Sequence, residues 1–261
     1  TGLSMNEKAA LITGAASGIG LALSRDLAKQ GYTILLTDAN LSAASSAAEQ
    51  LQAEGYKAEA HKLDVTSDAD IADLVGSVQS SGYELPLLIN NAGIQYVSNL
   101  EDFPVDRWRL INDVLLVGPA MLTRAVLPLM RKQNFGRIIN VGSIHALVAS
   151  KHKSAYVAAK HGLLGFSKVV ALETADQDIT INTICPSYVK TPLVEMQIAN
   201  QAKENGISEE DVINKIMLEP MPKKSFIEMD ELVGAMNYLA SNAARNMTGH
   251  ELVLDGGWTV R

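Results

Sequence analysis

The sequence predicts a single-domain α/β protein built on a parallel sheet. Short β-branched apolar runs alternate with longer segments of helical periodicity, a pattern typical of successive βαβ units. Of the 261 residues, 47% are hydrophobic, which is enough for a substantial core. No linker-like tract divides the chain, so we expect residues 1–261 to form one domain.

Seven apolar runs have the length and composition of buried strands. They span residues 9–13, 33–37, 58–63, 87–90, 136–141, 180–184 and 251–254. Six helical patterns separate or flank them, at residues 18–30, 41–54, 67–80, 105–133, 154–174 and 228–240. This alternation predicts that the strands lie parallel and that the helices cover the sheet.

Residues 190–225 interrupt the alternation between the sixth strand and the last helix. The segment contains two helical patterns and ends in EPMPKKS. Segments this long often close over binding sites, so we expect a helical lid over a substrate. A plain spacer is the alternative.

Charge and cysteine content limit the partners and the compartment. The net charge of −7 argues against nucleic acid, whose binding needs a basic surface. Cys185 is the single cysteine and lies in the apolar run ITINTIC, so we expect a buried strand residue and a reducing, cytoplasmic location. We expect no membrane-spanning stretch, no secretory leader and no metal site, since the five histidines are scattered.

The first strand runs into a glycine-rich turn that suits a dinucleotide pyrophosphate. Gly14, Gly18 and Gly20 precede a helix, whose N–H groups and positive dipole end attract phosphate. The spacing differs from GxGxxG, so the turn alone is weak evidence. Asp38 ends the second strand, where a carboxylate accepts ribose hydroxyls and repels a 2′-phosphate. We therefore predict NAD over NADP; a solvated strand-end aspartate is the alternative.

Two further strand ends extend the predicted cofactor site. Asp64 follows the third strand and can meet the adenine amino group, although it could instead cap the helix at 67–80. The fourth strand is followed by Asn90-Asn91-Ala92-Gly93. Small residues and amides there can pack beside a cofactor, but on physical grounds alone the segment is a turn.

Tyr156 and Lys160 share one helix face, because they are four residues apart in SAYVAAKHGLLGF. A tyrosine pKa of roughly 10 is too high for a base at neutral pH. A nearby ammonium and an oxidised nicotinamide would favour the phenolate. Ser143, at the end of the fifth strand, can hold a substrate oxygen while the tyrosine exchanges its proton. A surface Tyr–Lys pair is the alternative for the spacing alone.

Taken together, these segments resemble the short-chain dehydrogenases/reductases. The matching residues are Thr13-Gly14-x3-Gly18-x-Gly20, Asn90-Asn91-Ala92-Gly93, Ser143, Tyr156-x3-Lys160, Cys185-Pro186-Ser187 and Asp255-Gly256-Gly257. The resemblance implies a Rossmann-type, doubly wound sheet of seven parallel strands, hydride transfer at the nicotinamide ring, and a homotetramer with the Tyr156 helix at an interface. We assign cofactor contacts to Thr13, Gly14, Ser17, Gly18, Ile19, Gly20, Asp38, Asp64, Val65, Asn91, Ala92, Gly93, Tyr156, Lys160 and Pro186.

The chain departs from the family pattern at two positions. The family usually has an asparagine that supports a proton-relay water in the helix after the NNAG segment, and the matching residue here is Leu115. Asn112, one turn earlier, is a candidate substitute. Ser187 stands where the family commonly has glycine, a change that we expect the fold to tolerate.

Residues that follow strands four to seven should line the substrate pocket, since ligands bind at the carboxyl ends of such sheets. They are Gln95, His145, Lys153, Gln197 and Trp258. Lysine, histidine and two amides suit a small-molecule carboxylate. Each has an alternative taken singly: a solvated lysine, a satisfied loop histidine, surface amides, or a tryptophan that fills core or interface.

The segments SIHALVASKHKSAYVAAKHG, ALETA, ICPSYVKTPLVEMQI and DGGW resemble bacterial D-3-hydroxybutyrate dehydrogenases. This resemblance implies NAD-dependent oxidation of D-3-hydroxybutyrate to acetoacetate, a reaction of ketone-body metabolism. It implies substrate contacts from Gln95, Ser143, His145, Lys153, Tyr156 and Gln197. Tyr188 replaces a tryptophan usual in some members, so the apolar wall should differ in shape. The alternatives are a dehydrogenase for another short 3-hydroxy acid, a 3-oxoacyl substrate or a sugar alcohol, and a non-catalytic NAD(H) sensor.

Overall fold

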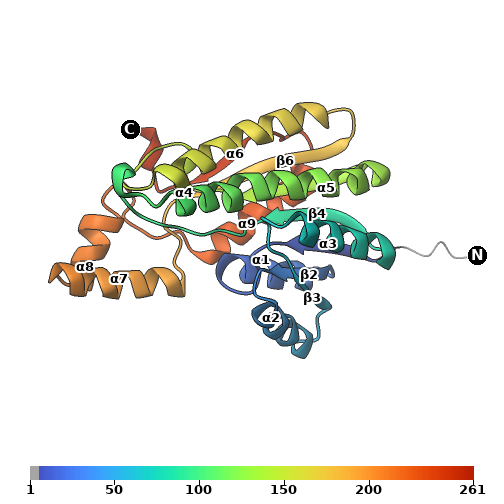
Figure 1. The fold of residues 1–261 in the computed structure, drawn as a ribbon, viewed down its shortest axis with the longest axis horizontal. Helices are drawn as coiled ribbons and strands as arrows, with labels where there is room; N and C mark the ends of the chain where they lie inside the picture. The colour runs from blue at the N-terminus through green and yellow to red at the C-terminus, as the bar shows by residue number, and fades with distance from the viewer. Residues whose placement is uncertain (1–5) are drawn as a thin grey trace, which may run out of the picture.

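Seven parallel strands form one central sheet in the computed structural model, which describes residues 6–261 (Figure 1). They are β1 (Lys8–Ile12), β2 (Thr33–Asp38), β3 (Ala58–Lys62), β4 (Glu84–Asn90), β5 (Phe135–Val141), β6 (Asp178–Pro186) and β7 (Glu251–Leu254). Their order is β3-β2-β1-β4-β5-β6-β7. The chain therefore winds outward from β1 in one direction and from β4 in the other, which confirms the doubly wound sheet.

Helices cover both faces of the sheet. They are α1 (Gly18–Lys29), α2 (Leu41–Ala53), α3 (Asp68–Ser81), α4 (Val105–Asn112), α5 (Gly118–Gln133), α6 (Ser154–Glu173) and α9 (Met229–Ala240). A π-helical turn at Asp113–Val117 joins α4 to α5, so the predicted helix at 105–133 is continuous but locally widened. The predicted boundaries agree with the structure to within three residues.

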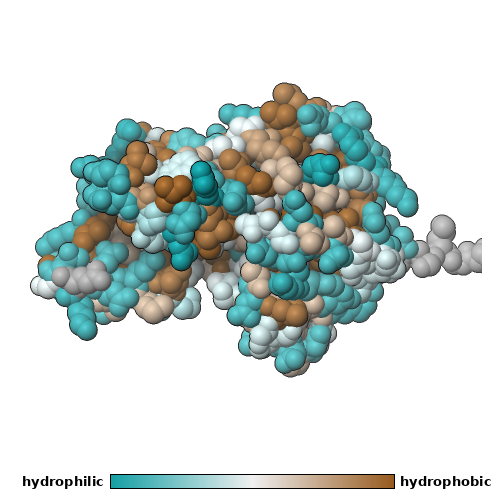
Figure 2. Space-filling view, viewed as in Figure 1, coloured by the Kyte–Doolittle hydropathy of each residue, from teal (hydrophilic) through white to brown (hydrophobic). Residues whose placement is uncertain are grey.

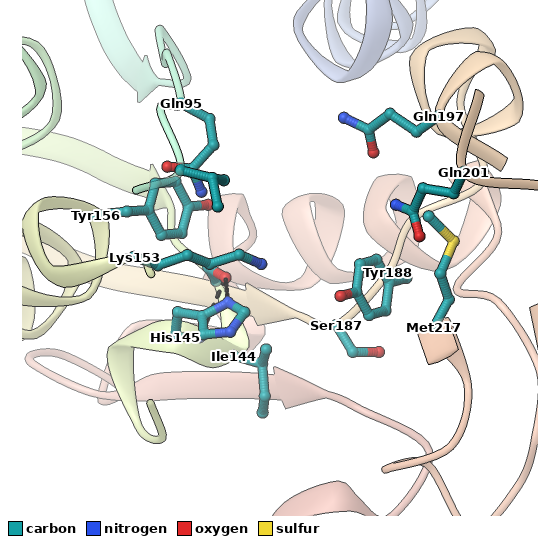
Figure 3. Close-up of a pocket in the computed structure, with 12 residues that line it drawn as sticks. Gln95, Ile144, His145, Lys153, Tyr156, Ser187, Tyr188, Gln197, Gln201 and Met217 are labelled. Atoms are coloured by element: carbon teal, nitrogen blue, oxygen red, sulfur yellow. Dashed lines mark hydrogen bonds between the residues drawn. The ribbon is translucent and has the colours of Figure 1, made fainter. Parts of the chain in front are cut away.

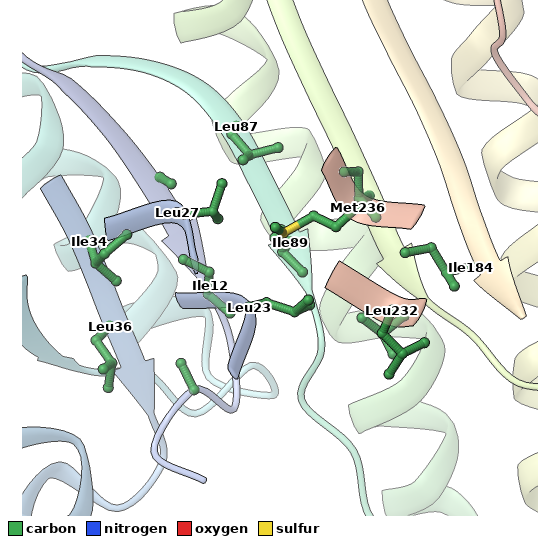
Figure 4. Close-up of a cluster of buried hydrophobic side chains, with 14 of the residues drawn as sticks. Ile12, Leu23, Leu27, Ile34, Leu36, Leu87, Ile89, Ile184, Leu232 and Met236 are labelled. Atoms are coloured by element: carbon green, nitrogen blue, oxygen red, sulfur yellow. The ribbon is translucent and has the colours of Figure 1, made fainter. Parts of the chain in front are cut away.

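The strands are apolar on both sides because the helices bury both faces. Ile12 and Leu36 point to one face and pack with Leu23 of α1, in a cluster that continues to α9 (Figure 4). Leu11 and Leu35, one residue earlier in each strand, point to the opposite face and join a second cluster with α3, α5 and α6. This alternation of side-chain direction is why near-continuous apolar runs, rather than alternating ones, marked the strands in the sequence.

The continuous helix Val105–Gln133 corrects one expectation from the sequence. By length and hydropathy alone it could cross a membrane, whereas no such stretch was predicted. In the fold its second half packs on β4 and β5, and its first half on α6. Its apolar composition is thus explained by contact with the sheet and with a neighbouring helix.

The segment 190–225 folds as two helical pieces that stand at one end of the molecule (Figure 1). They are α7 (Pro192–Asn205) and α8 (Glu209–Val212), the latter continued by a π-helical turn at Ile213–Met217. The chain leaves and rejoins the main body where Val189 pairs with Ile227. The carboxyl ends of the strands face this segment, so it borders the edge of the sheet where ligands bind.

We expect Leu23→Ala to lower the free energy of unfolding by about 2–5 kcal/mol, because it would leave a cavity in a core that excludes solvent. Urea denaturation at fixed protein concentration measures the change. Leu41→Ala, which truncates a leucine that is 46% exposed at the start of α2, is the matched control and should change it by less than about 0.5 kcal/mol. Equal losses in the two variants would contradict the packing described.

Candidate active site

The glycine-rich turn after β1 is held by tight backbone packing. Gly14 has a φ of +58°, and a Cβ there would lie 2.7 Å from the Ala92 Cα. A Cβ on Gly20 would lie 2.5 Å from the carbonyl oxygen of Gly14. The Asn91 amide donates hydrogen bonds to the carbonyls of Thr13 (3.1 Å) and Gly14 (3.0 Å). The segment after β4 therefore braces the turn, a role that the sequence alone did not distinguish from an ordinary turn.

Two carboxylates follow or end strands β2 and β3, and one of them contacts this turn. Asp38 Oδ2 accepts a hydrogen bond from the Ala16 N–H at 3.3 Å, which places the carboxylate against the glycine-rich turn. Asp64 Oδ1 accepts from the backbone and hydroxyl of Thr66, and the cap of α3 is Ser67. The helix-cap alternative for Asp64 is therefore wrong. Its Oδ2 atom has no hydrogen-bond partner among residues 6–261 and could accept one from a ligand.

The other predicted cofactor residues also lie at the carboxyl edge of the sheet. They are Thr13, Ser17, Gly18, Ile19, Val65, Asn91, Ala92, Gly93 and Pro186, which follow or end β1, β3, β4 and β6. Ser17 is the N-cap of α1, but its side chain accepts no hydrogen bond from the first N–H groups of the helix. N–H groups at a helix N-terminus that lack a capping side chain can bind a pyrophosphate group.

A chain of buried amides links the cofactor half to the helix that carries Tyr156. Asn90 Nδ2 of β4 donates to Asn140 Oδ1 of β5 at 2.9 Å. Asn140 Nδ2 donates to the Ser167 hydroxyl at 2.9 Å, and Ser167 donates to the Leu163 carbonyl at 2.8 Å within α6. The chain ties the two central strands to α6 by side-chain bonds in addition to the sheet ladder.

Lys160 and Tyr156 lie on one face of α6, next to the end of β5. The Lys160 ammonium is buried and donates a hydrogen bond to the Val141 carbonyl at 3.0 Å. It lies 5.6 Å from the centroid of the Tyr156 ring. Burial lowers the pKa of Lys160 to about 8, so the ammonium is still protonated at neutral pH. Burial raises the pKa of Tyr156, and contact with Ser143 opposes that rise.

Ser143 and His145 form the short turn that follows β5. The Ser143 hydroxyl accepts a hydrogen bond from the His145 N–H at 3.1 Å. His145 Nδ1 lies 3.4 Å from the same hydroxyl, and Nε2 lies 2.7 Å from the hydroxyl of Ser150. Burial and the charge of Lys153 lower the pKa of His145 to about 4. The imidazole is therefore neutral at pH 7 and has serine neighbours on both nitrogens.

A cavity of about 460 Å³ joins these groups to the 190–225 segment (Figure 3). Its walls are formed by Gln95, Val97, Ser143, Ile144, His145, Lys153, Tyr156, Ser187, Tyr188, Gln197, Gln201 and Met217. All six residues proposed for the substrate from the second resemblance are among them. Lys153 is half-buried and its amine points into the space, so it is not the solvated loop residue of the alternative interpretation.

One predicted substrate residue, Trp258, is not among those that line this cavity. Its indole lies behind the wall, with ring centroids 6.1 Å from His145 and 6.5 Å from Tyr188. Asp255 fixes this turn by accepting hydrogen bonds from Gly257 and Thr259. Trp258 therefore supports two lining residues from outside.

Two residues of the cavity wall, Gln201 and Met217, are not among those predicted from the sequence. Gln201 could have been found, because it lies one helical turn after Gln197 on the same face of α7. Met217 ends a π-helical turn and had no signal in the sequence. At the relay position, Leu115 is buried and packs with Ala159 and Tyr156 of α6. The Asn112 amide donates to the Trp108 carbonyl of its own helix.

Comparisons with known proteins agree with this geometry. The family described as short chain dehydrogenase matches residues 8–202. D-beta-hydroxybutyrate dehydrogenase of Rhizobium meliloti is 45% identical, covering 97% of this chain and 99% of that protein. The enzyme of the same name from Cupriavidus necator is 43% identical, with 98% and 100% covered. A solved actinorhodin polyketide ketoreductase with NADPH has a TM-score of 0.89 at 29% identity and covers 97% of both chains.

Fold and site together define an oxidoreductase that uses a nicotinamide cofactor. The chain belongs to the short-chain dehydrogenase family.

We expect burial of Lys160 to make stability depend on pH in a defined direction. Its pKa is about 8 in the fold against 10.5 in the unfolded chain, so between those values the unfolded chain binds more protons. The free energy of unfolding should therefore rise with pH in this window, by up to about 3 kcal/mol relative to Lys160→Met. Lys168→Met, which changes an exposed lysine of the same helix, should follow the wild-type curve; parallel curves for all three proteins would contradict the assignment.

Proposed function

We propose that this protein oxidises D-3-hydroxybutyrate to acetoacetate with NAD as the hydride acceptor. The observation that carries the proposal is that Lys153 lines the same cavity as Ser143 and Tyr156. A short 3-hydroxy acid has one group for each side: a hydroxyl for the Ser–Tyr pair and a carboxylate for the lysine. The two relatives called D-beta-hydroxybutyrate dehydrogenase support this choice of substrate.

Ser143, Tyr156 and Lys160 act at the hydroxyl end of the substrate. Ser143 holds the 3-hydroxyl oxygen, and Tyr156 removes its proton. The Lys160 ammonium beside the ring favours the phenolate that this step requires. When bound, the nicotinamide ring accepts the hydride from C3 and adds a positive charge near Tyr156.

The carboxylate is held by one charge and by neutral donors. Among the described residues that line the cavity, Lys153 alone carries a positive charge at pH 7, because His145 is neutral. Gln95 and Gln197 can each donate an N–H to a carboxylate oxygen. A half-buried ammonium with two amide donors favours a monoanion over a neutral alcohol.

The choice of NAD rests on Asp38. Its carboxylate lies against the glycine-rich turn, where the adenosine ribose of a dinucleotide would lie. A negative charge there accepts ribose hydroxyls and repels a 2′-phosphate.

The 190–225 segment is proposed to act as the lid of the site. Gln197 and Gln201 reach the cavity from α7, and Met217 from the second helical piece. The surface is hollowed between this segment and the end of the molecule that carries α1 and α2 (Figure 2). Movement about the Val189–Ile227 pairing would close the amides over a bound acid.

We further propose that the chain forms a homotetramer in the cytoplasm. An apolar stripe supports self-association through α4–α6, since Leu110, Val117 and Met121 are exposed at helical spacing on the continuous helix. Val169 and Leu172 are exposed on the adjacent α6. The one cysteine, buried in β6, suits a reducing compartment.

The direct test is the absorbance of NADH during incubation with a panel of hydroxy acids and neutral alcohols. We expect D-3-hydroxybutyrate to be oxidised, with kcat/KM for NAD exceeding that for NADP by about fivefold or more, because one unfavourable charge contact costs about 1–4 kcal/mol. Tyr156→Phe should lower turnover by about 10²–10⁴-fold while the protein still binds NADH. A preference for NADP, or full turnover without the phenol, would overturn the proposal.

We expect Lys153→Ala to raise KM for hydroxy acids by about 10–100-fold, since a hydrogen bond to a charged group contributes about 1.5–3 kcal/mol. The KM for a neutral secondary alcohol should change little. Lys151→Ala, an exposed lysine two residues away, is the matched control. A carboxylate clamp is excluded if acids and neutral alcohols lose affinity equally.

A further inference from the structure

The wall of the cavity opposite Tyr156 and Lys153 carries polar groups that the proposed reaction does not use (Figure 3). Tyr188 follows β6, and Gln201 lies on α7 one turn beyond Gln197. In Figure 3 the Tyr188 hydroxyl points toward the interior of the cavity, and the Gln201 amide points toward Tyr188. Neither side chain has a hydrogen-bond partner among residues 6–261, although both are half-buried.

The Tyr188 hydroxyl and the Gln201 amide can form hydrogen bonds to a ligand or to water in the cavity. A half-buried donor or acceptor without a partner loses part of its hydration, and a substrate group that pairs with it recovers that loss. Burial raises the pKa of Tyr188, so its side chain is a neutral phenol that can both donate and accept. The Gln201 amide offers the same two functions.

The size of the cavity leaves room for more than a four-carbon acid. The cavity has a volume of about 460 Å³, within the range of about 300–1,000 Å³ that is typical of small-molecule sites. An acid held between Lys153 and Tyr156 would lie on one side of it, and Tyr188 and Gln201 border the other side (Figure 3).

The charge of this wall selects the kind of group that it can bind. Ser187, Tyr188 and Gln201 are all neutral, and Met217 is the apolar neighbour. A second carboxylate would lack a counter-ion there, and a methyl group would leave the phenol and the amide unpaired. A hydroxyl, which donates and accepts, matches both.

Two rings separate Tyr188 from the reacting end of the cavity. Tyr156 lies 5.9 Å from His145, His145 lies 6.1 Å from Trp258 behind the wall, and Trp258 lies 6.5 Å from Tyr188, measured between ring centroids. Figure 3 shows Tyr188 on the opposite wall, across the cavity from Tyr156 and Lys153. A substrate anchored at Tyr156 and Lys153 can extend its remaining carbon toward that wall.

We infer that Tyr188 and Gln201 form a subsite for a second hydroxyl of the substrate, so that the preferred substrates are short 3-hydroxy acids that also carry a hydroxyl at C4, such as 3,4-dihydroxybutanoate. This inference rests on the proposed function. The chemistry is unchanged: the C3–H bond breaks with hydride transfer to the oxidised nicotinamide, the 3-hydroxyl proton passes to Tyr156, and the product is the 4-hydroxy-3-keto acid.

The test compares kcat/KM for 3,4-dihydroxybutanoate and D-3-hydroxybutyrate of the same C3 configuration. We expect the wild-type protein to prefer the dihydroxy acid. Tyr188→Phe and Gln201→Met, which keep the size of each side chain, should each lower the ratio of the two kcat/KM values by about fivefold, which corresponds to the loss of a hydrogen bond of about 1 kcal/mol. Tyr238→Phe, at an exposed tyrosine of α9, should leave the ratio unchanged.

The outcomes separate the inference from the function on which it rests. An unchanged ratio in both variants, or a wild-type preference for D-3-hydroxybutyrate, overturns the subsite while the proposed function stands. Equal losses for both acids assign Tyr188 and Gln201 to the carboxylate clamp and also overturn it. Oxidation of neither acid overturns both proposals. NADH binding by each variant, measured by fluorescence, verifies that the variants are folded.

Discussion

One buried ammonium group, that of Lys160, constrains the arrangement of the candidate site. It is removed from solvent, and its hydrogen-bond acceptor among residues 6–261 is the Val141 carbonyl at the end of β5. Burial destabilises the charged form of an amine, and here it lowers the pKa of Lys160 to about 8. The ammonium lies 5.6 Å from the centroid of the Tyr156 ring, and a positive charge near a phenol stabilises its ionised form. Strand β5, helix α6 and the turn at Ser143 bring these side chains to one cavity.

The parts of the site that the sequence predicted are those built from local patterns. The strands were recognisable because two-sided burial makes each one a short apolar run between helical segments. Gly14, Gly18 and Gly20 lie within one turn, and Tyr156 and Lys160 within one turn of helix. Short-range spacing fixes their geometry, so the structure needed only to bring the two groups to the same edge of the sheet.

The remaining features depend on contacts between distant segments. The serine neighbours of His145 and the position of Trp258 behind the cavity wall follow from the packing of loops after β5 and β7. The π-helical turns at Asp113–Val117 and Ile213–Met217 add one residue to a helical turn, which no hydrophobic periodicity reveals. Met217 ends the second of these turns and lines the cavity, and the apolar composition of helix Val105–Gln133 is explained only by its packing.

The amide chain from Asn90 through Asn140 to Ser167 has a consequence for how such a protein can evolve. It joins β4 and β5 to α6, the helix that carries Tyr156 and Lys160, by side-chain hydrogen bonds. The 190–225 segment is joined to these elements by the pairing of Val189 with Ile227 and by Leu218 and Met221, which pack into the main core. Mutations in residues 190–225 can therefore change which substrates the cavity accepts, while the hydrogen bonds that join β4, β5 and α6 are unchanged.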